Sequence, residues 1–315
     1  MGVAGIRKRL LVTGAAGHVG ARFVGYLAER NDIDVRIVVR KDTDRTLHEH
    51  GELIVGDLAD EAFCLEAAAG CNAIVHLASI PTAVTDSGLA VAAQTAMVRN
   101  LLTAAEAVRV ARFVHLSTIH VYGDGLRGTV DESTTPSPIS AYGAAHLAAE
   151  RVVHSSGLST SRLTLRCANG FGASTTNSTA PWGLVTGDLC MQAVGGAELR
   201  LQTHGRHQRD FIALSDVVRA LGFFSLESDA VGTIVLGSGR SMTLNDFALL
   251  VAERARLAFG RSYSVLCQSN DVSPALTYQL DTRRLQGSGF TPMNDFASEV
   301  DALLGAASAR MKALS

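Results

Sequence analysis

Short apolar runs alternate with longer, helix-like segments through the first half of the chain. The runs predict strands at 10–13, 35–39, 53–55, 73–77, 113–117 and 163–166, and the segments between them include helices at 62–69, 90–111 and 144–154. Strands that alternate with helices are typical of an α/β fold, in which helices cover both faces of a parallel sheet. Ligands of such sheets bind beyond the carboxyl ends of the strands.

The alternation changes after residue 166. The segment 169–187 is rich in Gly, Ser, Thr and Asn, and long irregular segments of compact proteins are usually functional or disordered. A helix at 217–224, a strand at 233–236 and a helix at 244–258, with Thr243 as its N-cap, are predicted to follow. We therefore expect a second, smaller lobe built from the C-terminal third and packed on the first.

A glycine-rich turn connects the first predicted strand to the first helix. The residues 13–20 read TGAAGHVG, a G-x-x-G-x-x-G spacing. In this geometry backbone N–H groups and a helix N-terminus can hold a phosphate. Gly14 would permit the tight turn, Gly17 would let a diphosphate approach the backbone, and Gly20 would let helix and strand pack closely. The alternative is a βα turn without a ligand.

The residues after the second and third strands bear on the choice of cofactor. Arg40 lies about 20 residues beyond the glycines, where a dinucleotide-binding fold often has an acidic residue that holds the ribose hydroxyls. An arginine there suits a ribose 2′-phosphate and favours NADP over NAD. In the alternative, Asp42 or Asp44 holds the ribose. Asp57 could accept a hydrogen bond from adenine, or form only an Asx turn.

A hydroxyl residue and a tyrosine are candidates for the chemistry. Thr118 ends the fifth predicted strand, and Tyr142 lies near the start of a predicted helix. A tyrosine so placed can act as acid and base at a carbinol carbon, with the hydroxyl orienting the same oxygen. A cation one helical turn further would stabilise the phenolate, and His146 holds that position. Alternatively, these are packing residues.

Charge and cysteine content exclude several classes of protein. A net charge of −2 provides no basic surface for nucleic acid or an anionic membrane, and no apolar run reaches the roughly 18 residues of a membrane span. The five cysteines are odd in number and form no C-x-x-C pair, which favours reduced thiols in a cytoplasmic protein. We expect no metal site, because the histidine pairs at 48/50 and 204/207 lack cysteine or carboxylate partners at ligand spacing.

Eight motifs, in this order, resemble the extended short-chain dehydrogenase/reductase family, in particular its nucleotide-sugar epimerase, dehydratase and reductase branch. They are TGAAGHVG at 13–20, GDL at 56–58, HLAS at 76–79, STIHVYG at 117–123, SAYGAAH at 140–146, LRCANGFG at 165–172, RDFIALSDVVRA at 209–220 and LGSGRSMTLNDF at 236–247. The resemblance implies a Rossmann-type doubly wound parallel sheet over residues 1–166, to which 211–240 return. It also implies a smaller C-terminal substrate-binding lobe made of 167–210 and 241–315.

The resemblance, together with Arg40, implies three sets of site residues. The cofactor contacts are Gly14, Gly17, His18, Val19, Gly20, Arg40, Asp57, Leu58, Leu77, Ala78, Ser79, Tyr142 and His146. The catalytic residues are Thr118, Tyr142 and His146, and the substrate contacts are Thr118, Asn169 and Arg209, the last on the nucleotide diphosphate. The resemblance further implies a homodimer formed through the helices at 90–111 and 144–154.

Two departures from the family pattern shape the expected function. His146 stands where the family has a lysine, and a histidine is mostly neutral at pH 7 unless a neighbour raises its pKa. The result is a working enzyme with a changed pH optimum, a slow enzyme, or a non-catalytic nucleotide-binding protein. Ile119 and His120 replace the Asp-Glu pair of the 4,6-dehydratases, which argues against water elimination.

We therefore expect a cytoplasmic, NAD(P)-dependent enzyme that acts on a nucleotide-activated sugar. An epimerase or a ketoreductase is preferred to a 4,6-dehydratase, with NADP favoured as the cofactor and NAD as the alternative. A non-catalytic binding protein and a reductase of a non-nucleotide ketone or aldehyde stay open as alternatives.

Overall fold

The computed structural model describes residues 7–41, 45–81, 84–155, 157–173, 181–268, 275 and 277–314. The chain forms two compact units. Unit 1 consists of Met1–Asp124, Thr135–Arg166 and Val218–Ile234. Unit 2 consists of Gly125–Thr134, Cys167–Val217 and Val235–Ser315.

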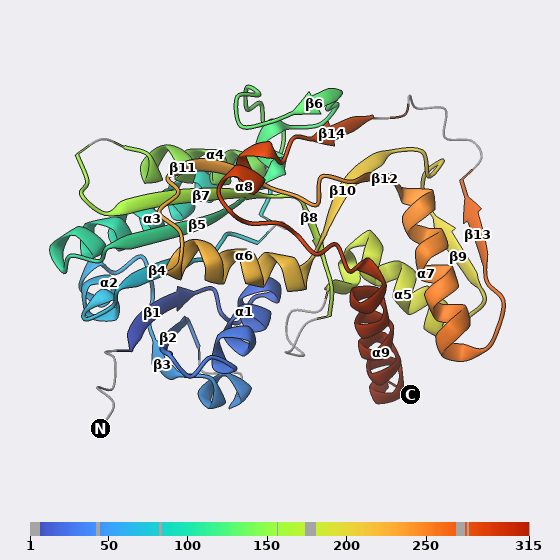
Figure 1. Cartoon of the computed structure of the whole chain (residues 1–315), viewed down its shortest axis with the longest axis horizontal. Coiled ribbons are helices and arrows are strands. Elements are labelled where there is room, and N and C mark those ends of the chain that lie inside the picture. Colours follow the sequence, from blue (N-terminus) through green and yellow to red (C-terminus); the bar gives the residue numbers. More distant parts are fainter. Residues whose placement is uncertain are drawn as a thin grey trace. The chain divides into compact units, whose positions relative to one another are not determined.

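A seven-stranded sheet forms the centre of unit 1 (Figure 1). Its order is β11-β7-β5-β4-β1-β2-β3, the doubly wound arrangement in which the chain starts in the middle and turns back. The strands are β1 Lys8–Thr13, β2 Ile33–Val39, β3 Glu52–Val55, β4 Ala73–His76, β5 Arg112–Thr118, β7 Ser161–Cys167 and β11 Gly232–Leu236. The pairs that join β3, β2, β1, β4 and β5 are parallel. The predicted α/β class and the predicted strands are confirmed.

Helices cover both faces of this sheet. They are α1 His18–Ala28, α2 Glu61–Ala68, α3 Ser87–Ala107, α4 Ala141–Val153 and α6 Leu214–Leu226, with short 3-10 turns at Arg45–Glu49 and Ile119–Tyr122. One core joins α2, α3 and α4 to the sheet through Leu11, Ile74 and Phe113. The helices α1 and α6 lie on the opposite side, where the Tyr26 ring packs against Gly222 (Figure 1). Alternate residues of each strand therefore face different cores.

Several helix boundaries differ from the sequence prediction, and two of them have a clear local reason. Helix α3 ends at Ala107 rather than Ala111, because Arg109 adopts a left-handed φ of 58°. Helix α4 starts at Ala141, three residues before the predicted start, because the Ser140 hydroxyl caps it by accepting a hydrogen bond from the Gly143 N–H at 3.1 Å. Tyr142 therefore lies in the first turn of α4.

Among the described residues, unit 2 is built from short strands and helices. Its strands are β6 Gly128–Val130, β8 Asn169–Phe171, β9 Glu198–Leu201, β10 Gln208–Ala213, β12 Ser241–Thr243, β13 Ser264–Cys267 and β14 Tyr278–Leu280. They pair as β12-β10-β8, β13-β9 and β14-β6. The helices are α5 Val185–Gly195, α7 Leu244–Phe259, α8 Arg283–Gly287 and α9 Phe296–Leu314, with a 3-10 turn at Pro181–Gly183.

An aromatic cluster forms the core of unit 2. The ring of Phe171 meets those of Phe211, Phe247 and Phe296 edge-on, with centroids 5.1 to 6.3 Å apart. The predicted helix at 244–258 is confirmed, and Thr243 caps it through a capping box with Asp246. Between residue 166, where the alternation of strands and helices changes, and the predicted helix at 217–224, the structure contains β8, α5, β9 and β10, while residues 174–180 lie outside the described residues.

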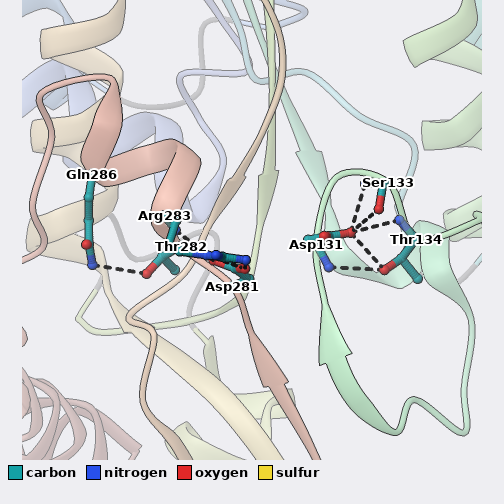
Figure 2. A network of polar contacts seen from close by, with 7 residues as sticks. All are labelled: Asp131, Ser133, Thr134, Asp281, Thr282, Arg283 and Gln286. Atoms are coloured by element: carbon teal, nitrogen blue, oxygen red, sulfur yellow. Dashed lines mark hydrogen bonds and ion pairs between the residues drawn. The ribbon is translucent and has the colours of Figure 1, made fainter.

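Polar turns follow the β6–β14 pair of unit 2 (Figure 2). The Asp131 carboxylate accepts hydrogen bonds from the backbone N–H groups of Ser133 and Thr134, and the Asp281 carboxylate accepts from the guanidinium of Arg283. These local bonds fix the chain direction after each short strand. Across the described residues, no helix is both long enough and apolar enough to cross a membrane.

Candidate active site

The glycine-rich turn is a close-packed connection between β1 and α1. Gly14 has a φ of 74°, and a Cβ atom there would lie 2.5 Å from the Ala78 nitrogen. A Cβ atom at Gly20 would collide with the Gly14 carbonyl oxygen, which itself accepts the Gly17 N–H at 2.9 Å. Glycine is therefore required at both ends of the turn.

The N-terminus of α1 is suited to an anion. Gly17 is its N-cap, no side chain among the described residues caps it, and no acidic residue lies in its first turn, which contains His18 and Val19. The partial positive charge of a helix N-terminus favours a phosphate. A tight glycine turn that leads into an uncapped helix fits the diphosphate of a dinucleotide.

Two buried amides of α3 hold the neighbouring loops, and sequence reasoning missed both. Gln94 donates to the Ala78 carbonyl at 3.2 Å and accepts the Ile80 N–H at 3.0 Å. Asn100 donates to the carbonyls of Leu58 and Ala59, at 3.0 Å each. The signal available in the sequence was a pair of amide side chains within a helix rich in Ala and Leu. They fix the segments that contain the predicted contacts Leu77, Ala78, Ser79 and Leu58.

Two predicted nucleotide contacts lie beyond the ends of β2 and β3. Arg40 directly follows β2, and its side chain is exposed. Asp57 is also exposed, and its Oδ1 accepts the Ala59 N–H at 2.9 Å, which is an Asx turn. The local role considered for Asp57 is therefore present. The cofactor contacts of both side chains stay predictions.

Thr118 and Tyr142 belong to elements that approach each other closely. Thr118 ends β5, and its Oγ1 accepts the His120 N–H at 3.2 Å. Tyr142 is half-buried in the first turn of α4. A Cβ atom at Gly143 would lie only 2.6 Å from the His120 carbonyl oxygen, so glycine permits this approach. The structure thus brings a strand-end hydroxyl and a helix-start phenol to one region of unit 1.

His146 packs beneath Tyr142 as a neutral ring. The two rings meet edge-on with centroids 4.5 Å apart, and His146 is only 3% exposed. Neither of its ring nitrogens has a hydrogen-bond partner among the described residues. Burial, together with the nearby His120, lowers the pKa of His146 to about 4. No positive charge therefore lies at this position at pH 7.

The His146 ring is the end of a buried histidine stack that sequence reasoning did not find. His76 and His115 are register partners on β4 and β5, with ring centroids 5.4 Å apart, and His115 stacks on His146 at 5.9 Å. Burial lowers the pKa of His76 to about 3 and that of His115 well below its usual value. Thr13 Oγ1 lies 2.8 Å from His76 Nδ1. Among the described residues, no group of three or more His, Cys, Asp or Glu side chains is placed to hold a metal ion.

The two predicted substrate contacts outside unit 1 are neighbours within unit 2. Strand β8 pairs with β10, and the Asn169 amide donates to the Asp210 carbonyl at 2.9 Å. Arg209, the residue before Asp210, is half-buried and donates to the Gln208 carbonyl at 3.0 Å. Burial raises the pKa of Asp210 to about 6, although hydrogen bonds from Ser238 act in the opposite direction.

Known proteins resemble this chain over most of its length. It is 26% identical to a dTDP-glucose 4,6-dehydratase of Streptomyces niveus, covering 92% of this chain and 89% of that protein. It is 27% identical to a dTDP-L-rhamnose 4-epimerase of Burkholderia thailandensis, covering 78% and 80%. The solved structure of MoeE5 in complex with UDP-glucuronic acid and NAD is 25% identical, covers 96% of this chain and 99% of that one, and superposes with a TM-score of 0.78.

The glycine turn, the end of β5 and the start of α4 all lie in the part of the chain that matches a known family. The sequence model of the NAD dependent epimerase/dehydratase family matches residues 10–237, which include all of these features. The chain belongs to the NAD dependent epimerase/dehydratase family, within the extended short-chain dehydrogenases/reductases.

Proposed function

We propose that the protein is an NAD(P)-dependent epimerase or ketoreductase of a nucleotide-activated sugar. The arrangement of Thr118 and Tyr142 carries this proposal, because a strand-end hydroxyl and a helix-start phenol lie on elements in close approach. Relatives named for dTDP-sugars, and a neighbour solved with UDP-glucuronic acid and NAD, support the substrate class.

Each side chain has a distinct role in the proposed reaction. In the oxidation, the Tyr142 phenolate takes the proton of the sugar hydroxyl as the hydride leaves the same carbon. In the reduction, the Tyr142 phenol returns a proton to the carbonyl oxygen. The Thr118 hydroxyl donates a hydrogen bond to that oxygen and orients it. A nicotinamide cofactor, held by its diphosphate at the glycine turn, would supply the chemistry of hydride uptake and release.

An epimerase or ketoreductase is preferred to a 4,6-dehydratase because of the residues after Thr118. Ile119 is buried and has no group that can transfer a proton, whereas water elimination needs both an acid and a base. His120 is exposed with its ring centroid 6.1 Å from that of Tyr142, and by itself it supplies only one of the two groups. We propose Arg209 and Asn169 as contacts of the nucleotide part of the substrate.

A turnover assay tests this proposal. The purified protein is incubated with dTDP- and UDP-sugars and either oxidised or reduced nicotinamide cofactor, and nicotinamide absorbance and sugar products are followed. Product formation with nucleotide sugars supports the proposal. Binding without turnover across the panel supports a non-catalytic protein, and turnover of simple ketones or aldehydes alone supports the reductase alternative.

We propose NADP as the preferred cofactor because Arg40 is exposed directly after β2. Arg40→Ala is expected to weaken NADPH binding about 10- to 100-fold, since a charge-assisted pair with phosphate contributes about 1.5–3 kcal/mol. NADH binding should change less than twofold. Titration of nicotinamide fluorescence measures both constants. Lys41→Ala removes the adjacent charge as a control, and equal losses for NADPH and NADH in Arg40→Ala would contradict a 2′-phosphate contact.

The neutral His146 predicts a measurable response to a restored cation. His146→Lys is expected to shift the acidic limb of the kcat/KM pH profile by about one to two units toward lower pH, because a positive neighbour lowers the pKa of the Tyr142 phenol. His146→Gln, which stays neutral, is the matched control and should leave the limb in place. An identical limb in all three proteins would show that residue 146 does not tune Tyr142.

We also propose that the protein is a cytoplasmic homodimer. All five cysteines are free thiols, which supports a reducing compartment. Helices α3 and α4 pack side by side in unit 1 and leave a groove of about 350 Å³ whose lining includes Leu102, Val152 and Leu158. This groove supports the same two helices as the dimer contact.

A further inference from the structure

A buried polar network lies beneath the proposed catalytic residues. The Arg166 guanidinium on β7 forms an ion pair with Glu150 on α4, with Nη2 2.7 Å from Oε2 and Nε 3.1 Å from Oε1. Ser117 on β5 donates to Glu150 Oε1 at 2.5 Å, and Arg166 Nη1 donates to the Tyr122 hydroxyl at 3.0 Å. All four residues are buried, and each is at most 6% exposed. The Glu150 carboxylate and the Arg166 guanidinium therefore form their hydrogen bonds mainly with protein groups and are shielded from water.

Stability alone is a weak explanation for such a network. A buried ion pair loses the hydration of both charges, and well-packed apolar residues of similar volume are often equally stabilising. Removing one partner, in contrast, leaves an unpaired buried charge and is strongly destabilising. The network therefore defines geometry more effectively than it adds stability, because charge-assisted bonds constrain both distance and angle.

The bonds of the network converge on the two elements that carry the proposed chemistry. Glu150 lies one helical turn after His146 and two turns after Tyr142, so it fixes the rotation and depth of α4. Ser117 is the residue before Thr118, and Tyr122 ends the turn that follows Thr118. The Arg166 guanidinium also stacks 4.8 Å above the Tyr122 ring. The helix that carries the phenol and the strand end that carries the hydroxyl are thus joined through one carboxylate.

We propose that Glu150 and Arg166 are positioning residues that set the geometry between Thr118 and Tyr142. Their polar atoms are bonded to each other and to Ser117 and Tyr122, and they act on the reaction only through the elements that they join. This inference rests on the proposed roles of Thr118 and Tyr142. In this chain residue 146 provides no positive charge beside Tyr142, and the proposed role of the network is to hold Tyr142 and Thr118 in place.

Three variants test the proposal through turnover. Glu150→Asp keeps the charge but shortens the side chain by one methylene, Glu150→Gln keeps the length but removes the charge, and the double variant Glu150→Met/Arg166→Met removes both charges together. We expect kcat to fall about 10- to 100-fold in each, because a displacement of about 1 Å reduces rates on this scale. KM for the nucleotide sugar and Kd for the cofactor should change less than threefold. A fourth variant, Arg166→Met, is the reference for stability: the double variant should recover the thermal stability that Arg166→Met loses, without recovering kcat.

A control at the other end of the same strand separates positioning from folding. Arg112 on β5 is also buried, and it donates to the Phe224 carbonyl at 2.9 Å and the Ser161 hydroxyl at 2.8 Å. Arg112→Met should lower thermal stability but leave kcat per folded molecule unchanged. Full kcat in Glu150→Asp, or in the folded double variant, would overturn the proposal. If the double variant does not fold, Glu150→Gln and Glu150→Asp decide the question.

A second readout does not depend on turnover. The phenol of Tyr142 is titrated by ultraviolet absorbance, as the difference between each protein and the same protein carrying Tyr142→Phe. We expect its pKa in Glu150→Asp to differ by at least about half a unit from that in the otherwise unchanged protein, and an unchanged pKa would overturn the proposal. If the natural sequence turns over no nucleotide sugar, the proposed function fails, and this titration still tests the positioning role.

Discussion

Tyr142→Phe is expected to lower kcat by about 10²- to 10⁴-fold, the range typical of the loss of a general acid and base. The phenylalanine ring keeps the packing against His146, whose ring centroid lies 4.5 Å away, and loses only the hydroxyl that exchanges the proton. Cofactor binding at the glycine turn should change little. Turnover with the nucleotide sugar found active in the panel, and fluorescence titration of the cofactor, measure the two effects separately.

Tyr26→Phe is the matched control for this substitution. Tyr26 lies on α1 in the same unit, stacked on Phe23 with ring centroids 6.4 Å apart, so its variant loses a phenol hydroxyl away from Thr118 and Tyr142. It should retain the turnover of the natural sequence. Full activity of Tyr142→Phe would remove Tyr142 from the mechanism, and equal losses in both variants would point to a general effect on folding.

Acidification from pH 7 to 5 is expected to lower the free energy of unfolding by about 3–5 kcal/mol. His76, His115 and His146 are buried, and burial holds the pKa of each below the value of about 6.5 in an unfolded chain. The unfolded state therefore binds protons in this range that the folded state does not bind, so stability falls as the pH falls. Each histidine contributes on the order of 2 kcal/mol over these two units. Asp210, whose pKa burial raises to about 6, acts in the opposite direction and offsets about 1 kcal/mol.

Urea titrations followed by circular dichroism at several pH values measure this dependence. His115→Phe is the informative comparison, because both ring nitrogens of His115 are buried without a hydrogen-bond partner among the described residues. Phenylalanine keeps an aromatic ring between His76 and His146 and removes one titrating group. The loss of stability between pH 7 and 5 should become smaller by about 2 kcal/mol. A pH dependence equal to that of the natural sequence would show that His115 is protonated in the folded state as readily as in the unfolded one.

The neutral His146 also affects the proton transfer proposed for Tyr142. A lysine would place a permanent charge one turn after Tyr142, whereas the buried His146 places a neutral ring there. The Tyr142 phenol then loses its proton less readily at neutral pH. In an epimerase or ketoreductase of this kind, we therefore expect a pH optimum above neutrality, which corresponds to the working enzyme with a changed pH optimum among the outcomes considered from the sequence.

The elements that the sequence analysis missed have different physical causes. The strands β6 and β14 have three residues each and pair across about 150 positions, from Gly128 to Tyr278, so no local periodicity indicates them. Helix α9 was different, because Val300, Leu303, Leu304 and Ala307 repeat at helical spacing and would have predicted it. Helix α5 begins within the sequence 169–187, which is rich in Gly, Ser, Thr and Asn, so the residue pattern did not indicate where the helix starts.

The sequence by itself determined the α/β class, the glycine turn, the strand ends and the identity of Thr118, Tyr142 and His146 as candidates. These follow from local patterns, since periodicity, turn residues and short motifs are encoded by neighbours in the chain. Only the tertiary structure decided that His146 is buried and neutral, because its pKa is lowered by burial, beside the His115 ring of β5, and by the nearby His120. It likewise decided that Glu150 joins Arg166, Ser117 and Tyr122, because side chains from a helix, two strands and a turn meet only once the sheet has formed.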